Sequence, residues 1–224
     1  MDGAGRPGDV PRQASGGGPQ ADAAPDTATA PARCTHLLYL HGFRSSPQSA
    51  KARLVGTWLA ANRPDVVFHC PQLPPSPAEA VRGVLAHTSG WPRETMVVVG
   101  SSLGGFYATA VAERLGCRAA LLNPAVNPAR DLAKYIGETT AWHSDERFWF
   151  RDEFIGELRA LDPGVLTRPE RYFAVIAKGD EVLDWREMAA RHAGCRIKLL
   201  EGGDHALSDF EAHLPDVVMF LGLY

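Results

Sequence analysis

Residues 96–105 read MVVVGSSLGG, an apolar run that leads into the pattern G-x-S-x-G with Ser102 at its centre. The run Met96–Val99 predicts a buried β-strand, and apolar side chains recur at helical spacing after Gly104. A serine on a sharp turn between a strand and a helix is typical of a nucleophile elbow, which holds the hydroxyl exposed at the end of a sheet. Gly100 and Gly104 leave room for that turn, so the stretch predicts a serine nucleophile.

The same pattern has a simpler interpretation, in which a glycine turn precedes a helix and Ser102 only caps that helix. The strand before it favours the nucleophile instead. Ser101 offers a rival hydroxyl next to it in the sequence. We assign Ser101 no catalytic role, because the turn points that position away from the reaction centre.

Five further apolar segments recur along the chain with helix-like stretches between them: 36–40, 66–69, 119–122, 173–177 and 196–200. Buried strands separated by helices are the pattern of a parallel sheet covered on both faces. The sequence therefore predicts an α/β fold with a mostly parallel sheet of about six strands. Ser46-Pro47 predicts the start of the first helix, and Asn62-Arg63-Pro64 predicts its end.

Two segments depart from this regular alternation. Residues 1–33 have almost no large apolar side chains, so burial could not offset the entropy cost of ordering them. We expect a disordered tail there and a single domain over 34–224. Residues 128–168 are rich in aromatic side chains and predict an inserted cap or lid over the carboxyl edge of the sheet, the alternative being an ordinary helix pair packed on the sheet.

Composition excludes several classes of function. With 23 Lys and Arg against 26 Asp and Glu, the net charge of −3 leaves no basic stripe, so we expect no nucleic-acid partner. No apolar run approaches the roughly 18 residues of a membrane span, and the start MDGAGRPGDVPRQ lacks a secretory signal, so we expect a cytoplasmic protein without membrane attachment. The four cysteines lack metal-ligand spacing, and we expect reduced thiols, no metal and no cofactor.

The general base of such a nucleophile is expected after the last strand, because this kind of site orders its residues as serine, acid and histidine. His205 stands there, in the run GGDHAL from Gly202. His69 falls within a strand, and His192 and His213 fall in helical stretches. We therefore predict His205 as the base.

The acid is expected after the strand over residues 173–177, where the loop KGDEVLD offers three carboxylates. Asp180 comes first after the strand and follows a glycine, so we predict it as the acid. Asp184 is better placed to cap the helix that follows, and Glu181 points the opposite way to its neighbour. Asp204 is too close in sequence to His205 to orient its imidazole.

An oxyanion needs two preorganised N–H donors. The backbone of Leu103, directly after the nucleophile, supplies one, and the loop His41-Gly42-Phe43-Arg44 after the strand over 36–40 supplies the other from Phe43. We expect His41 to hold this loop by hydrogen bonds rather than to transfer a proton. Gly42 and His41 are also candidate substrate contacts, as is Arg44, which either meets an anionic group or is a solvated surface arginine.

Several longer motifs occur together, namely LLYLHGF-x-SSP-x-SAKA from Leu37, PQLPP from Pro71, GSSLGG from Gly100, NPAV from Asn123, GDEVLD from Gly179 and EGG-x-HA from Glu201. Over residues 37–224 the chain resembles the YqiA-type bacterial esterases, which are small α/β-hydrolases. The resemblance implies an α/β-hydrolase fold and esterase activity on acyl esters or acyl thioesters. It also implies Ser102, Asp180 and His205 as the catalytic triad.

The expected function is a serine esterase acting on a small-molecule acyl ester through an acyl-enzyme. A thioesterase or a peptidase could use the same triad. A binding protein that keeps the fold without turnover is the alternative from another class. Residues 1–33 lie outside the family pattern and residues 128–168 diverge from it, so the resemblance does not predict the size or type of the substrate. The sequence does not predict the oligomeric state either.

Overall fold

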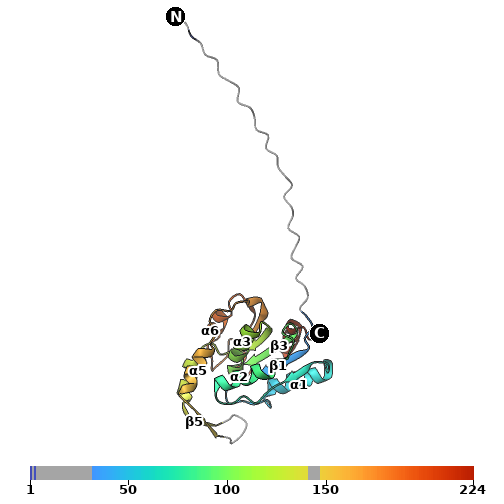
Figure 1. Ribbon diagram of the computed structural model, residues 1–224, viewed down its shortest axis with the longest axis vertical. Helices are drawn as coiled ribbons and strands as arrows, with labels where there is room; N and C mark the ends of the chain where they lie inside the picture. The colour runs from blue at the N-terminus through green and yellow to red at the C-terminus, as the bar shows by residue number, and fades with distance from the viewer. Residues whose placement is uncertain (2, 4–31, 141–146) are drawn as a thin grey trace. The chain divides into compact units, whose positions relative to one another are not determined.

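The structure is a computed structural model of the 224-residue chain, and it describes Met1, Gly3 and residues 32–140 and 147–224. The predicted disordered tail lies outside the described residues apart from two residues at each of its ends. From residue 32 onward the chain forms an α/β domain (Figure 1).

Six parallel strands form the main sheet, in the order β2-β1-β3-β4-β7-β8. Their bounds are His36–Leu40 (β1), Val67–His69 (β2), Met96–Ser101 (β3), Arg118–Leu122 (β4), Tyr172–Ala177 (β7) and Arg196–Leu200 (β8). Strands β3 and β7 are mainly apolar and are buried along their whole length, because helices cover both faces of the sheet. The predicted fold class is therefore confirmed.

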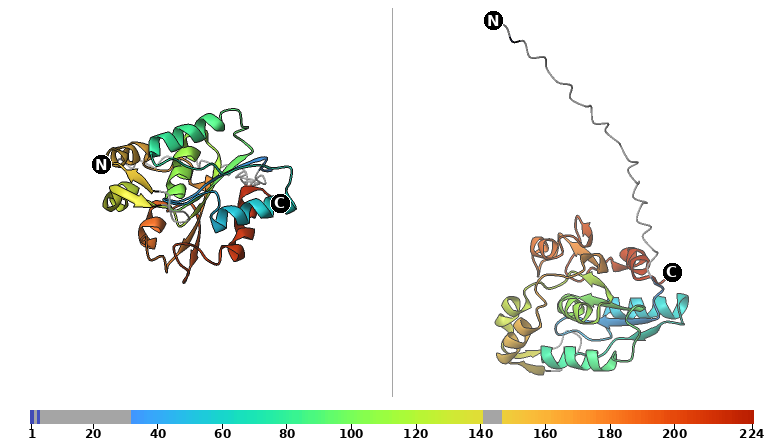
Figure 2. Two further views of the ribbon diagram at one scale, coloured as in Figure 1. Left: turned by 90° about the horizontal axis from the view of Figure 1, so that it is seen from below. Right: turned by 45° about the horizontal axis from the view of Figure 1, so that its top comes forward.

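The longer helices are α1 (Ala50–Asn62), α2 (Pro77–His87), α3 (Leu103–Leu115), α5 (Glu153–Leu161), α6 (Trp185–Arg191) and α7 (Phe210–Leu221). Alternate residues of β1 point to opposite faces, with Leu37 and Tyr39 packed in the cluster with α1 and α7, and Leu38 and Leu40 in the cluster with α2 and α3. The left view of Figure 2 shows these two helical layers on either side of the sheet. The core is thus divided by the sheet into two apolar halves.

The strand order fixes where a site can form. From β1 the chain moves outward to β2 and then returns to place β3 on the other side of β1. α1 and α3, which follow β1 and β3, pack on opposite faces of the sheet. This is a topological switch point, where a crevice opens at the carboxyl ends of the two strands.

The start of α1 differs from the sequence prediction. Ser46 does not cap the helix, because its Oγ accepts a hydrogen bond from the backbone N–H of Gln48 at 3.1 Å in the turn before it. The helix begins at Ala50 instead, with Ser49 at the N-cap position. The predicted end is confirmed, since α1 ends at Asn62.

The segment over 128–168 holds a short helix α4 (Pro128–Asp131), a 3-10 turn η1 (Ala133–Tyr135), an antiparallel strand pair β5 (Gly137–Thr140) and β6 (Arg147–Phe150), and α5. A second 3-10 turn, η2 (Pro169–Arg171), leads into β7. α5 packs against α2, where Glu157 accepts hydrogen bonds from Ser76 Oγ at 2.7 Å and Ala78 N at 2.9 Å. Part of the segment is therefore an ordinary packed helix, whereas α4 and η1 line a cavity described below.

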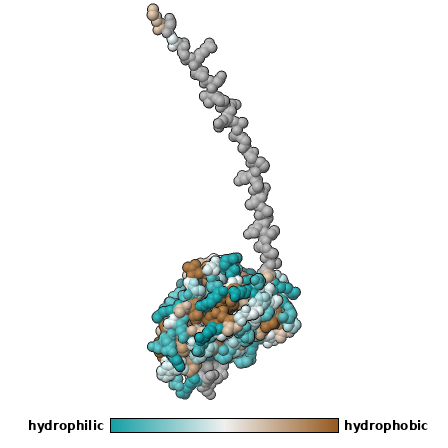
Figure 3. All heavy atoms as spheres, viewed as in Figure 1, coloured by the Kyte–Doolittle hydropathy of each residue, from teal (hydrophilic) through white to brown (hydrophobic). Residues whose placement is uncertain are grey.

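The face of the molecule drawn in Figure 3 is largely hydrophilic, with an apolar area near its middle. Across the described ranges, no helix is both long enough and apolar enough to cross a lipid bilayer.

Candidate active site

Ser102 occupies the sharp turn between β3 and α3. Its backbone is in the left-handed region, with φ 56° and ψ −121°, and its side chain makes no capping hydrogen bond to α3. A Cβ on Gly104 would overlap the carbonyl oxygen of Leu40, and a Cβ on Gly100 would overlap that of Gly104. The turn therefore requires both glycines. The strained backbone of Ser102 presents its side chain at the end of the sheet, where it does not cap the helix.

The structure brings Ser102, His205 and Asp180 together in one hydrogen-bonded chain. His205 Nε2 lies 2.9 Å from Ser102 Oγ, and His205 Nδ1 lies 2.8 Å from Asp180 Oδ2. An ionised carboxylate can only accept, so Nδ1 carries the proton and Nε2 is free to accept the serine O–H. This is the geometry of a nucleophile, a base and a residue that orients the base.

The side chain of Asp180 is fully buried, and both of its oxygens accept hydrogen bonds. Its Oδ1 accepts from the backbone N–H groups of Val182 and Leu183, both at 2.8 Å, while Oδ2 accepts from His205. These backbone bonds stabilise the charged carboxylate and hold it against the imidazole. The tight turn after β7 therefore fixes the acid in place.

The rival carboxylates have other partners. Asp184 caps α6 by accepting from the N–H of Arg186 at 2.8 Å, as the sequence predicted. Asp204 accepts from Ser208 Oγ at 2.6 Å. Glu181 Oε2 accepts from the backbone N–H of His205 at 3.0 Å, a contact that sequence reasoning missed.

Asn123 is a further residue that the sequence did not single out beyond its place in a motif. Its side chain is fully buried directly after β4. Nδ2 donates to the carbonyl oxygens of Asp204 at 3.0 Å and His205 at 3.2 Å, and Oδ1 accepts from the N–H of Ala177 at 2.8 Å. Asn123 thus ties the histidine loop to the ends of β4 and β7.

The two backbone N–H groups expected to bind an oxyanion are those of Leu103 and Phe43. No oxygen within the described ranges accepts a hydrogen bond from the N–H of Leu103 or Phe43. A Cβ on Gly42 would lie 3.3 Å from Ser102 Cβ and 3.7 Å from Ser102 Oγ, so the loop passes directly beside the nucleophile. Both N–H groups are therefore free to bind an oxygen that develops charge near Ser102.

His41 holds this loop in place. Its Nδ1 donates to the carbonyl of Gly42 at 3.0 Å, and its Nε2 accepts from the N–H of Leu73 at 3.1 Å. The side chain is buried, which lowers the pKa of the imidazole and favours the neutral form. Both ring nitrogens are occupied, which agrees with a structural role and leaves no free nitrogen for proton transfer.

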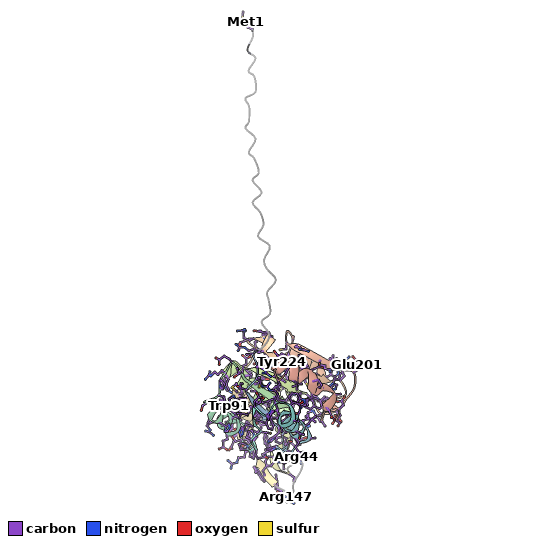
Figure 4. The ribbon with its side chains drawn as sticks, turned by 90° about the vertical axis from the view of Figure 1, so that its right-hand side faces the viewer. Met1, Arg44, Trp91, Arg147, Glu201 and Tyr224 are labelled. Carbon is purple, nitrogen blue, oxygen red and sulfur yellow. The ribbon has the colours of Figure 1, made fainter. Side chains whose placement is uncertain are left out.

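Arg44 turns toward the β5–β6 pair rather than toward Ser102. Its Nε donates to the carbonyl of Thr140. Figure 4 shows Arg44 at the end of the domain that also carries Arg147 of β6. It lines a neighbouring cavity of about 320 Å³, but not the one that contains Ser102, so its predicted contact with substrate stays a prediction.

A cavity of about 480 Å³ opens over Ser102 and His205. One wall comes from α4 and η1 and includes Leu132 and Tyr135. The other comes from the start of α1 and includes Lys51, which the sequence reasoning did not consider. The cavity is large enough for an acyl group and a leaving group of modest size.

The described residues offer little support for metal-dependent or cysteine-dependent catalysis. Among the residues that the structure describes, no cluster of His, Cys, Asp and Glu is arranged to hold a metal ion. The four cysteines are free thiols, and burial raises the pKa of Cys34 to about 11 and of Cys117 to about 12. Neither is a thiolate at neutral pH, so neither competes with Ser102 as a nucleophile.

Comparison with known proteins identifies a family and a fold for this chain. A sequence profile of the uncharacterised protein family UPF0227 matches residues 36–222. Similar solved structures include Est1E from Butyrivibrio proteoclasticus with ferulic acid bound, at 14% identity and a TM-score of 0.66, covering 85% of this chain and 89% of that one.

The esterase domain of a Rhodothermus marinus protein is similar at 20% identity and a TM-score of 0.60, covering 86% of this chain and 87% of that one. Mouse alpha/beta hydrolase domain-containing protein 10 matches at 16% identity and a TM-score of 0.62, covering 82% and 89%. At these identities the likeness shows a shared α/β-hydrolase fold alone.

Proposed function

We propose that this chain, which belongs to the uncharacterised protein family UPF0227, is a serine esterase that hydrolyses carboxylic esters through an acyl-enzyme. The observation that carries the proposal is the hydrogen-bonded chain from Asp180 through His205 to Ser102, formed by residues 25 and 103 positions apart in sequence. Such a chain lowers the cost of removing the serine proton only when nucleophile, base and orienting acid are all in place.

In the acylation step, His205 Nε2 takes the proton from Ser102 Oγ while Oγ attacks the ester carbonyl carbon. The N–H groups of Leu103 and Phe43 stabilise the negative charge on the carbonyl oxygen. Collapse of the tetrahedral intermediate breaks the bond to the leaving oxygen, which receives the proton from His205. Asp180 stabilises the imidazolium in between and keeps its ring oriented.

In the deacylation step, a water molecule replaces the alcohol. His205 takes a proton from the water as its oxygen attacks the acyl-enzyme carbonyl, and the same two N–H groups stabilise the second oxyanion. Ser102 Oγ then leaves with the proton from His205. The products are a carboxylic acid and the regenerated enzyme. His205 accepts and returns each proton that is transferred in the two steps.

A panel of p-nitrophenyl esters from acetate to palmitate tests this proposal. We expect Ser102-dependent release of p-nitrophenolate, and a loss of about 10⁶-fold in kcat for Ser102→Ala, as for removal of the nucleophile from comparable triads. Ser101→Ala is the matched control, because it removes the neighbouring hydroxyl and should keep activity. Equal rates for wild type and Ser102→Ala across the panel would contradict the proposal.

A further inference from the structure

The wall of the 480 Å³ cavity formed by the start of α1 carries a cation. Lys51 lines the cavity, and its Nζ donates a hydrogen bond to the carbonyl of Ala206, the residue after His205. An ammonium has three donors, and within the described ranges the other two have no acceptor. A positive charge with spare donors therefore lies next to the loop that carries the proposed base.

The same wall is the N-terminus of a 13-residue helix. Ala50 and Lys51 line the cavity, and no described residue accepts a hydrogen bond from either backbone N–H. Ser49 at the N-cap position makes no side-chain capping bond, so it does not satisfy these donors. Free N–H groups and the positive end of the helix dipole both favour an anion at this place.

A third observation is independent of the helix. Tyr39, on β1, lines the same cavity, is completely buried, and its hydroxyl has no hydrogen-bond partner among the described residues. A buried hydroxyl without a partner is costly, and native proteins contain few such groups. A residue that lines the cavity together with Lys51 thus carries a buried donor without a partner.

The nearby carboxylates do not neutralise this wall by contact. Asp180 uses both oxygens on His205 and on two backbone N–H groups, and Asp204 is bonded to Ser208. Asp131, on α4, also lines the cavity, and it pairs with Arg130 at 2.8 Å. Burial lowers the pKa of Lys51, with Asp204 and Asp180 opposing that shift, so an anion bound beside the ammonium would favour its charged form.

We propose that this wall, which consists of Lys51, the first backbone N–H groups of α1 and the Tyr39 hydroxyl, binds a carboxylate carried by the ester substrate. A carboxylate carries one negative charge, which equals the single positive charge of the Lys51 ammonium. The inference rests on the proposed esterase function and narrows it to esters with a free carboxylate within the length of the cavity. In this inference Lys51 recognises the anionic group of the substrate, a role for which Arg44 was a candidate from the sequence.

Two pairs of substrates test the inference. In the first pair the carboxylate is on the acyl side, p-nitrophenyl hemiglutarate against neutral p-nitrophenyl valerate. In the second it is on the leaving group, 4-acetoxybenzoate against neutral 4-acetoxybenzamide. Because hydrogen bonds to charged groups are among the stronger ones, we expect kcat/KM to favour the charged member of at least one pair by roughly tenfold. The favoured pair tells which side of the ester carries the anion.

Substitutions test which residue causes the preference for the charged substrate. Lys51→Met should reduce the charged-to-neutral ratio of kcat/KM to near one, and Lys51→Arg, which keeps the charge, should retain most of it. Lys134→Met removes another lysine that lines the cavity, on η1, and Lys198→Met removes a lysine on β8 outside the cavity. Neither should change the ratio, so these two variants control for a general loss of positive charge.

Tyr39→Phe gives a second readout. It should lower the charged-to-neutral ratio and raise the melting temperature of the ligand-free protein, because it removes an unpartnered buried hydroxyl. A lower melting temperature would show that the hydroxyl already has a partner and would overturn its part in the site.

Equal kcat/KM within both pairs, or a ratio that responds to Lys134→Met and not to Lys51→Met, overturns the inference. Neutral esters separate this failure from that of the proposed function. If they are hydrolysed in a Ser102-dependent manner while charge makes no difference, the esterase proposal stands and the carboxylate site is wrong.

Discussion

The side-chain amide of Asn123 donates a hydrogen bond to the backbone carbonyl of His205 at 3.2 Å, although 82 residues separate the two in sequence. The same amide nitrogen also donates to the carbonyl of Asp204, and its oxygen accepts from Ala177 at the end of β7. Asn123 itself has a positive φ of 41°, a conformation that asparagine tolerates better than most residues. One buried side chain therefore sets the position of the histidine loop relative to the sheet.

Replacement of Asn123 should affect both stability and turnover. Asn123→Ala leaves two carbonyls and one N–H without their partner, so we expect the free energy of unfolding to fall by about 2–4 kcal/mol. We also expect kcat to fall by roughly 10- to 100-fold with little change in KM, because a displaced base is poorly aligned with Ser102. Urea unfolding and p-nitrophenyl acetate kinetics measure the two effects.

Asn127→Ala is the matched control, because that exposed asparagine caps α4 through one bond to the N–H of Arg130. It should cost about 1 kcal/mol and leave kcat unchanged. A folded Asn123→Ala protein with the wild-type kcat would contradict the positioning role.

Replacement of the adjacent carboxylates Asp180 and Glu181 should change kcat to very different extents. Asp180→Asn keeps an acceptor for the backbone N–H groups but cannot hold His205 in the required tautomer, and we expect kcat to fall by about 10⁴-fold, as in comparable triads. Glu181→Gln keeps an acceptor for the N–H of His205, and we expect less than a tenfold change. Steady-state kinetics of both variants measure the two changes in kcat. Comparable losses from the two would argue against Asp180 as the orienting acid.

Gly42→Ala should impair turnover without unfolding the protein. The new methyl group would lie 3.3 Å from Ser102 Cβ, so the loop must shift by a few tenths of an ångström and move the N–H of Phe43. We expect kcat to fall by up to about 10²-fold, the effect of weakening one oxyanion donor. Gly83→Ala, in open space on α2, should leave kcat unchanged and add about 0.5–1 kcal/mol of stability. Unchanged kcat in Gly42→Ala would exclude this loop from the site.

Stability should decrease as the pH falls below about 6.5, the ordinary value for histidine. Burial lowers the pKa of His41 and of His192, so the unfolded chain binds these protons at a higher pH than the folded protein does. Their contribution is complete above the unfolded pKa and is lost as the pH falls from there toward the folded pKa. Urea unfolding at pH 7.5 and 5.5 measures it.

His192→Asn keeps a donor for the carbonyl of Met188 and removes one titrating group, so the stability of this variant should depend less on pH. A variant with the same loss of stability between the two pH values as the wild type would show that His192 does not contribute.

Much of the fold could be predicted because central parallel strands are buried on both faces and read as apolar runs. The strands at 36–40 and 196–200 were predicted with their observed bounds. The motif resemblance is confirmed by the family match over residues 36–222. Local turn chemistry also singled out Ser102, Asp180 and His205, and the fold brings these three side chains within hydrogen-bond distance of one another.

The features that the sequence did not predict depend on contacts between distant segments. Asn123 and Lys51 carry no local signal that distinguishes them from a turn asparagine or a surface lysine; the hydrogen bonds that matter join them to residues 81 and 155 positions away. The start of α1 was misplaced because Ser46 can complete a turn as readily as a cap. The segment over 128–168 lacks a single periodicity because it combines a packed helix, a strand pair and cavity-lining turns.

The most direct test of Ser102 as a nucleophile is labelling with a fluorophosphonate probe, followed by mass spectrometry of the modified peptide. We predict one adduct per chain, on Ser102, with wild-type labelling of Ser101→Ala and none of Ser102→Ala. Absence of an adduct on Ser102 in the wild type, or equal labelling of Ser102→Ala, would contradict the account.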